Sequence, residues 1–461
     1  MKKTITLLLS VLAAVSCNFL DETLKGGYTA ENYYTSESKA ELAVNAIYNS
    51  LYDNVLWIFG DVASDDSVKG GDDGDQPQIG EIDQFIATSD NGSLDQFWKS
   101  TYETIARANN AIDGISGMEI NETTKARLIG EAKFLRAYSY FNLVNIFGQV
   151  PLKTRTQNTS AAIHVGLSPV ADIYAQIDRD LTEAAAGLPK GNGGRVGRGA
   201  AYALLAKSKV FQGKYEEALA AITSLENNND GFDLEPNYAD LFKEGGENSV
   251  ESLFAIRYMN TKTASRGNNL NVWFSPFSEE GGYHFNQPTQ SFVDCFDEDG
   301  DVRLDASIGR DGQPWFNGTT FQAAWGNVTG YLVKKYDTDK TEDIAKSQTM
   351  VPQHRIRYAE VLLLKAEALN ETGGAGAADA LDLVRQRAGL GKVKADNQAD
   401  LREAIRKERR RELGFEFHRF FDVMRYGKDY AVAALGSACW PSDRYYFPIP
   451  QSETEANAAL K

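Results

Sequence analysis

Two segments of the sequence hold enough acidic and basic side chains to suggest catalysis or metal binding. In the first, KERRRELGFEFHRFFDVMRYG, His418 lies near Glu412, Glu416, Arg419 and Asp422, which are the residue types of an acid/base centre. The charges alternate in sign at helical spacing, so they can pair along a helix and with neighbouring elements. We therefore expect no catalytic residue in this segment.

The second segment, DCFDEDGDVRLDAS, places Asp297, Asp299 and Asp301 at the first, third and fifth positions of a calcium-loop pattern. Position six is Val302 rather than Gly, and position twelve is Ile308 rather than Glu, so the segment is not an EF-hand. We expect a turn in which Asp301 pairs with the arginine two residues further on or with a helix end. A looser structural calcium site is the alternative, and no other cofactor is indicated.

Other common catalytic patterns are missing from the sequence. There is no G-x-S-x-G nucleophile elbow, and the connector GNGGRVGRG lacks the spacing of a phosphate-binding loop. The four histidines do not lie at metal-ligand spacing from one another: His164, His284, His354 and His418. The sequence thus predicts a protein that is not an enzyme.

Aromatic side chains in loop-like segments are the strongest candidates for ligand contact. Trp57, Trp273, Tyr283, Trp315 and Trp325 lie beside Asn, Gly, Asp and Gln, where a buried helix face does not explain them. A flat indole can cover the apolar C–H face of a sugar ring while polar groups bind its hydroxyls. We therefore expect these rings to stand exposed, with local packing an equal alternative for any single one.

Two polar residues lie in the same loops as the aromatic candidates. Asp66 and Arg266 could accept or donate hydrogen bonds to hydroxyl groups of a ligand. By contrast, Trp98 repeats a helical face with Tyr102 and Ile105, which favours burial in the core.

The elements that must position these loops are long helices. Apolar residues recur at helical spacing over 36–52, 94–115 and 128–147, and Gly148 and Pro151 end the third run. Further helices are expected at 168–187 and in two pairs, around 202–222 and 358–387, that lie close to a tetratricopeptide pattern.

These patterns predict a mainly α fold with a tetratricopeptide-like helical-repeat scaffold at about 36–226 and 351–430. The segments 53–91 and 227–350 form the expected loop-rich ligand region. The first is rich in Asp, Gly and Gln, and the second contains short alternating runs at 253–258 and 331–336 that predict short strands.

The amino terminus has the layout of an export signal. Lys2 and Lys3 precede a short apolar run that stops at Cys17, and the run is shorter than a membrane-spanning helix. Residues 1–16 are therefore expected to be a lipoprotein signal peptide, with Cys17 as the lipidated residue, although Ala14 departs from the usual Leu. A plain signal peptide with an incidental cysteine is the alternative.

The net charge and the cysteine content limit the classes of binding partner and of disulfide bond that the protein can have. The net charge of −16 disfavours nucleic acid or an anionic membrane surface, so the membrane is expected to be reached only through the lipid anchor. Beyond Cys17 the only cysteines are Cys295 and Cys439, which could form one bridge or remain free.

Four stretches in order resemble the SusD/RagB family of outer-membrane nutrient-binding lipoproteins. They are EAKFLRAYSYFNLVNIFGQVPL, GRGAAYALLAKSKVFQGKYEEAL, RYAEVLLLKAEALNETG with VRQRAGL, and AIRKERRRELGFEFHRFFDVMRYG followed by YFPIPQSE. The resemblance spans most of residues 17–461. It implies a tetratricopeptide-based scaffold, binding of an oligosaccharide or polysaccharide at the cell surface, and partnership with a SusC-like TonB-dependent transporter in the outer membrane.

Three alternatives to glycan capture stay open on the sequence alone. A surface glycoside hydrolase would need two loop carboxylates about 5 to 10 Å apart. A helical-repeat adaptor that binds only proteins is disfavoured by the concentration of tryptophan in the loops. A family member that captures peptides rather than sugars is not excluded.

Overall fold

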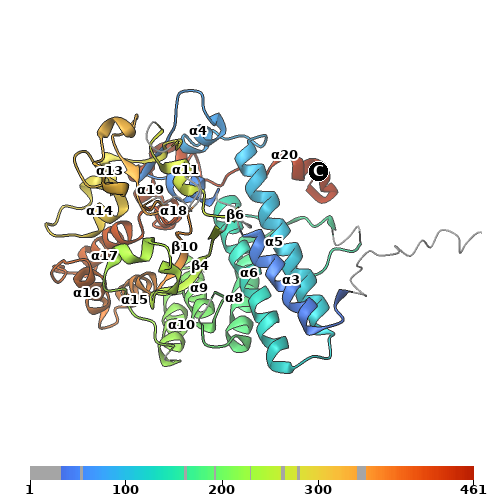
Figure 1. The fold of residues 1–461 in the computed structure, drawn as a ribbon. Coiled ribbons are helices and arrows are strands. Elements are labelled where there is room, and N and C mark those ends of the chain that lie inside the picture. The colour runs from blue at the N-terminus through green and yellow to red at the C-terminus, as the bar shows by residue number, and fades with distance from the viewer. Residues whose placement is uncertain are drawn as a thin grey trace, which may run out of the picture.

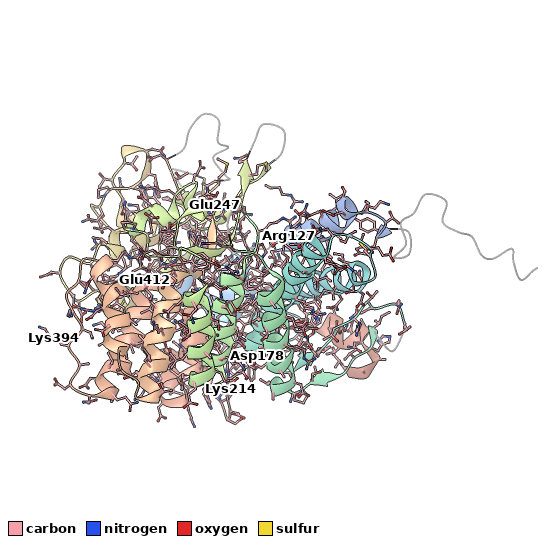
Figure 2. The ribbon with its side chains drawn as sticks, turned by 90° about the horizontal axis from the view of Figure 1, so that it is seen from below. Arg127, Asp178, Lys214, Glu247, Lys394 and Glu412 are labelled. Atoms are coloured by element: carbon pink, nitrogen blue, oxygen red, sulfur yellow. The ribbon has the colours of Figure 1, made fainter. Side chains whose placement is uncertain are left out.

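Antiparallel helices packed side by side form one layer of the protein, and a loop-rich region lies along it (Figures 1 and 2). The computed structural model describes residues 33–51, 55–159, 163–191, 194–228, 230–260, 265–277, 281–339 and 349–460. The expected signal peptide and Cys17 lie outside the described residues.

The helical layer is built from two parts of the chain that meet where α10 packs against α15. The first part contains α3 (Glu37–Ser50), α5 (Gly92–Ser116), α6 (Glu122–Phe147), α8 (Val170–Gly187), α9 (Arg198–Phe211) and α10 (Tyr215–Asn227). The second part contains α15 (Tyr358–Thr372), α16 (Ala377–Arg387), α17 (Gln398–Leu413), α18 (Arg419–Arg425) and α19 (Lys428–Leu435). The predicted mainly α helical-repeat fold is confirmed.

Local signals set the ends of these helices. The side chain of Asn91 accepts hydrogen bonds from the backbone N–H groups of Ser93 and Leu94 at the start of α5. Helix α6 ends at Gly148, which has a positive φ of 72°, as the sequence pattern predicted. Helix α15 ends at Gly373 in the left-handed conformation.

The loop-rich region contains short elements, as expected. Its strands form antiparallel pairs: β1 (Ser67–Gly70) with β7 (Phe285–Pro288), β4 (Ser252–Ile256) with β10 (Gln353–Arg357), β5 (Met259–Asn260) with β6 (Ser265–Arg266), and β8 (Ile308–Gly309) with β9 (Leu332–Val333). The predicted runs at 253–258 and 331–336 correspond to β4 and β9. The strand β10 was not predicted, because residues 351–357 were assigned to the helical scaffold.

Short helices complete the region and the flanks. They are the π-helix η2 (Ile58–Val62), α4 (Pro77–Asp83), α11 (Leu270–Phe274), α13 (Gln290–Asp294), α14 (Arg303–Ser307) and α20 (Gln451–Ala456), with the 3₁₀ turns η3 (Tyr238–Phe242), η4 (Gly246–Asn248), η5 (Phe316–Gly318), η6 (Ala323–Trp325), η7 (Ser437–Cys439) and η8 (Ala458–Leu460). A small pair of strands, β2 (Val150–Pro151) and β3 (Leu167–Ser168), joins α6 to α8.

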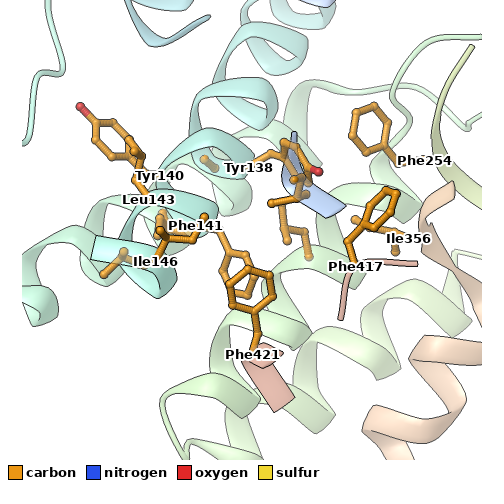
Figure 3. Close-up of a cluster of buried hydrophobic side chains, with 14 of the residues drawn as sticks. Tyr138, Tyr140, Phe141, Leu143, Ile146, Phe254, Ile356, Phe417 and Phe421 are labelled. Atoms are coloured by element: carbon orange, nitrogen blue, oxygen red, sulfur yellow. The ribbon is translucent and has the colours of Figure 1, made fainter. Parts of the chain in front are cut away.

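One large hydrophobic core connects the helical layer to the loops. Figure 3 shows Tyr138 of α6 on the side of Phe254 of β4, Ile356 of β10 and Phe417, while Tyr140 points away from them, and all of these residues belong to the same core as Phe421. Trp98 lies in the same core with 2% of its surface exposed, which confirms the burial expected from its helical spacing.

The charged segment around His418 forms buried ion pairs, as expected. Arg409 and Arg425 both contact the Asp422 carboxylate, and Arg357 contacts Glu412 and Glu416. Burial alone would raise the pKa of Glu416, but Arg357 and Lys335 outweigh it and lower that pKa to about 2. These carboxylates therefore carry charge within the core and are neutralised by neighbouring cations.

The acidic turn of the calcium-like pattern is held by cations of the protein itself. Arg303 pairs with Asp301 at 2.7 Å, as predicted, and Asp297 accepts hydrogen bonds from Arg411 and Lys407. Within the described ranges, no group of three or more His, Cys, Asp or Glu side chains is arranged to hold a metal ion. Both Cys295 and Cys439 are free and buried.

Two buried histidines should make the folded protein sensitive to acid. Burial lowers the pKa of His354 and of His418 to about 4, below the ordinary value of 6.5. Unfolded chains therefore bind these protons first, so stability present above pH 6.5 is lost as pH falls towards 4. We expect a loss of about 2 kcal/mol per histidine between pH 7.5 and pH 5.

The measurement is urea unfolding across this pH range. His354→Gln should flatten the pH dependence by one histidine's share, with His164→Gln as the matched control near the surface. A free energy of unfolding that stays constant from pH 7.5 to 5, or an unchanged slope in His354→Gln, would contradict the assignment.

Candidate binding site

A hollow of about 520 Å³ lies where the start of η2, the helices α4 and α11, and the start of α5 meet. Its apolar wall comprises five side chains: Val55, Trp57, Ile58, Ile79 and Trp273. Two of the predicted aromatic candidates, from segments more than two hundred residues apart in sequence, thus line the same space.

Three of the aromatic candidates form a continuous series beside this hollow. The ring centroids of Trp57 and Trp273 are 5.8 Å apart, and those of Trp273 and Tyr283 are 5.7 Å apart. Trp273 is partly buried, and Tyr283 is 48% exposed. Trp57 is only 1% exposed, so it supports Trp273 from behind. The rings accessible to a ligand are therefore Trp273 and Tyr283.

The expectation that all five rings stand exposed is wrong for three of them. Besides Trp57, Trp315 is 5% exposed and Trp325 is 8% exposed. These two tryptophans pack with Phe321 and Leu332 in a small separate core, away from the other candidates. The loop around them folds onto itself, and burial of large apolar surface stabilises that arrangement.

The two polar candidates also differ from the expectation. Asp66 is 1% exposed, and its carboxylate pairs with the guanidinium of Arg410 at 2.5 Å. A carboxylate so engaged is a structural partner within the protein. Arg266 is exposed on β6, and it is not among the described residues that line the hollow.

Polar groups surround the apolar wall without carrying charge. They are the hydroxyl of Ser93 and the amides of Gln76, Gln78, Gln96 and Asn269. Gln76 has a left-handed φ of 45° and precedes Pro77, which begins α4, while Gln96 lies on the exposed face of α5. Amides both donate and accept hydrogen bonds, as do the hydroxyl groups of a sugar.

The sequence alone did not single out these amides. For Gln76 and Gln78 the only signal was the general richness of 53–91 in Asp, Gly and Gln, which could not indicate which side chains converge, and Gln96 and Asn269 lie outside that segment. Their approach depends on the left-handed turn at Gln76 and on the docking of α4 next to α5.

A buried carboxylate fixes the segment that carries Trp57. Asp61 in η2 accepts a hydrogen bond of 3.0 Å from the backbone N–H of Phe417 and one of 3.1 Å from the amide of Asn286. Burial raises the pKa of Asp61 well above its ordinary value. The π-helix is thus attached to β7 and to the turn before α18, and π-helical turns are frequent at functional sites.

A glycine makes this attachment close. A Cβ atom at Gly60 would overlap the backbone of Phe417, so only glycine permits the observed approach. The position of Trp57 therefore depends on a contact between segments that are far apart in the sequence. The position of Trp273, which packs against Trp57, depends on the same contact.

Together, the fold and this hollow define a helical-repeat protein whose loops carry an aromatic-walled hollow with an amide rim. No helix in the described part of the chain is both long enough and apolar enough to span a bilayer.

Comparisons with known proteins agree with the sequence resemblance. The family model described as "SusD family" matches residues 250–461, and the one described as "Starch-binding associating with outer membrane" matches residues 23–210. SusD-like protein P2 of Formosa agariphila is 28% identical over an alignment of 476 positions, gaps included, that covers 92% of this chain and 90% of that protein. The chain belongs to the SusD/RagB family.

Solved structures give the same result. A laminarin-binding SusD-like protein is 28% identical, with a TM-score of 0.78 over 91% of this chain and 97% of its own. A SusD-like carbohydrate-binding protein of Bacteroides fragilis is 26% identical, with a TM-score of 0.80 over 93% of this chain and 100% of its own.

Substitution of Gly60 should destabilise the contact between η2 and Phe417 that positions Trp57. We expect Gly60→Ala to lower the free energy of unfolding by about 1–3 kcal/mol, because the added methyl group must displace the Phe417 backbone. The measurement is urea unfolding, with Gly117→Ala as the matched control, since a Cβ there meets open space. Equal stability of the two variants would show that the close contact at Gly60 does not exist.

Proposed function

We propose that this protein captures an oligosaccharide segment of a glycan at the cell surface, with the hollow beside Trp273 as its binding site. The observation that carries the proposal is the pairing of an accessible aromatic wall with a rim of amides. Trp273 and Tyr283 offer apolar faces to sugar C–H groups, and Gln76, Gln78 and Gln96 offer hydrogen bonds to hydroxyl groups.

The relatives support a sugar as the ligand. One similar structure is titled as laminarin-binding and another as carbohydrate-binding, and each covers more than nine-tenths of this chain. The alternative of a peptide ligand has no such support, and no described charged residue lines the hollow to hold peptide termini.

The hollow also favours binding over hydrolysis. A glycoside hydrolase needs two carboxyl groups flanking the scissile bond. Among the described residues that line the hollow there is no aspartate or glutamate, and Asp66 is engaged by Arg410. A bound glycan would therefore leave this site with its chain length unchanged.

The remaining parts of the function concern the membrane. Residues 1–16 would direct export, and diacylglycerol on Cys17 would tether the protein to the outer membrane, because stable anchoring requires more than one acyl chain. A SusC-like TonB-dependent transporter would then receive the captured glycan.

Removal of the accessible indole should weaken glycan binding. We expect Trp273→Ala to reduce affinity by about 10-fold or more, since truncation of an aromatic anchor costs roughly 1.4 kcal/mol or more. The measurement is isothermal calorimetry with oligosaccharides that a glycan array first identifies as ligands.

Trp440→Ala is the matched control, because Trp440 is also partly buried and does not line the hollow. Its affinity should equal that of the wild type. If Trp273→Ala binds as tightly as Trp440→Ala, the hollow is not the glycan site. A reducing-sugar assay on the same glycans should show no new chain ends.

Loss of the anchor cysteine should release the protein from the membrane. We expect Cys17→Ser to abolish incorporation of labelled palmitate and to move the protein out of the outer-membrane fraction. Cys439→Ser is the control, since Cys439 is buried in the folded chain. Continued labelling of the Cys17→Ser variant would exclude Cys17 as the lipidated residue.

A further inference from the structure

The described residues that line the hollow are all uncharged. This is unusual for a chain in which Asp, Glu, Lys and Arg make up 24% of the residues. Aromatic rings and amides recognise the ring faces and hydroxyl groups common to all sugars. Recognition of a carboxylate or sulfate group is commonly provided by arginine or lysine, through charge-assisted hydrogen bonds.

Charged side chains next to the lining residues in sequence are engaged elsewhere. On α5, Asp95 and Lys99 flank Gln96 and pair with each other at 2.7 Å. Near α4, the carboxylate of Asp83 accepts a hydrogen bond of 3.0 Å from the backbone N–H of Lys69. The ammonium group of Lys69 donates to the backbone carbonyl of Asp75.

Two arginines that contact the segment after η2 are likewise committed to carboxylates of the protein. Arg410 pairs with Asp65 and Asp66, and Arg419 pairs with Asp65 at 2.7 Å. Withdrawing Arg410 to meet a ligand would remove the close partner of the buried Asp66 carboxylate, which is strongly destabilising, and withdrawing Arg419 would leave Asp65 with Arg410 alone. Arg410 and Arg419 are thus held by carboxylates of the protein, and no Lys or Arg is among the described residues that line the hollow.

The ionisable side chain next to Tyr283 already has an acidic partner within the protein. His284 lies 3.3 Å from the carboxylate of Asp72, which is on the same loop as Gln76. The protein as a whole carries a net charge of −16, so a polyanionic glycan would also be repelled as it approached.

We infer that the hollow selects uncharged glycans and rejects chains that carry uronate or sulfate groups. This inference rests on the proposed function and names the class of glycan that the same site takes. An anionic sugar seated against Trp273 would lose hydration, and no described residue of the lining carries a positive charge to compensate for that loss. A neutral sugar loses only hydroxyl hydration, which the amide rim can replace.

The experiment compares one glycan backbone with and without charge. Neutral hexasaccharides of several linkages are first screened by calorimetry against the intact mature protein, together with alginate, polygalacturonate and sulfated galactan fragments. The best neutral ligand that has a C6 hydroxyl is then compared with the same chain oxidised at C6 to uronate. We expect the oxidised chain to bind at least about 10-fold more weakly.

Salt dependence and a charge-adding variant give two further readouts. Affinity for the neutral chain should change by less than about 2-fold between 20 and 300 mM NaCl, since no charges are brought together. Gln96→Lys should reduce the difference in affinity between the neutral and the oxidised glycan, because it places a cation at the rim of the hollow. Gln386 is exposed on α16, and Gln386→Lys adds the same charge away from the hollow. This variant should leave the difference in affinity between the two glycans unchanged.

The outcomes separate this inference from the proposed function. If an acidic chain binds as tightly as its neutral counterpart, and Trp273→Ala weakens that binding, the site holds glycans and the selectivity inference is overturned. If Trp273→Ala binds every chain as the wild type does, the proposed function itself fails. A 10-fold preference for the neutral chain that Gln96→Lys reduces, and Gln386→Lys does not, supports the inference.

Discussion

The guanidinium of Arg357 is the interaction on which the arrangement of the loops depends. It is 1% exposed at the end of β10 and contacts Glu251, Glu412 and Glu416, which come from the loop-rich region, the end of α17 and the turn that follows it. A buried pair of this kind contributes little net stability compared with an apolar core, but removing one partner is strongly destabilising. The effect of Arg357 is to hold the loop-rich region against the end of α17 and the turn that follows it.

The segment held by Arg357 is connected to the binding hollow through a short series of contacts. Glu416 precedes Phe417, whose backbone N–H donates to Asp61 and whose carbonyl region lies against Gly60. The π-helix η2 is thereby held in place, and Trp57 at its start packs against Trp273. The ligand-facing ring is positioned by buried charge in the scaffold, more than by local loop propensity.

Local sequence patterns predicted the helices well and the site only in part. Helical periodicity and glycine ends are properties of neighbouring residues, so the bounds of α5 and the end of α6 could be predicted, whereas α6 begins six residues before the predicted run. Asp66 pairs with Arg410, 344 residues further along the chain, and no local pattern encodes such a partner. Trp315 and Trp325 looked exposed because their loop is polar, but the loop closes on itself around Phe321. Trp273 and Tyr283 met the expectation of accessible rings because they lie beside a real hollow.

The central claim is that a glycan sits against the wall formed by Trp273. A crystal structure of the protein with its best-bound hexasaccharide would test this directly. The account predicts a pyranose ring with its C–H face about 4 Å from the indole of Trp273 and its hydroxyl groups hydrogen-bonded to the amides of Gln76, Gln78 or Gln96. Clear density for the sugar at another surface, with this hollow filled only by water, would contradict it.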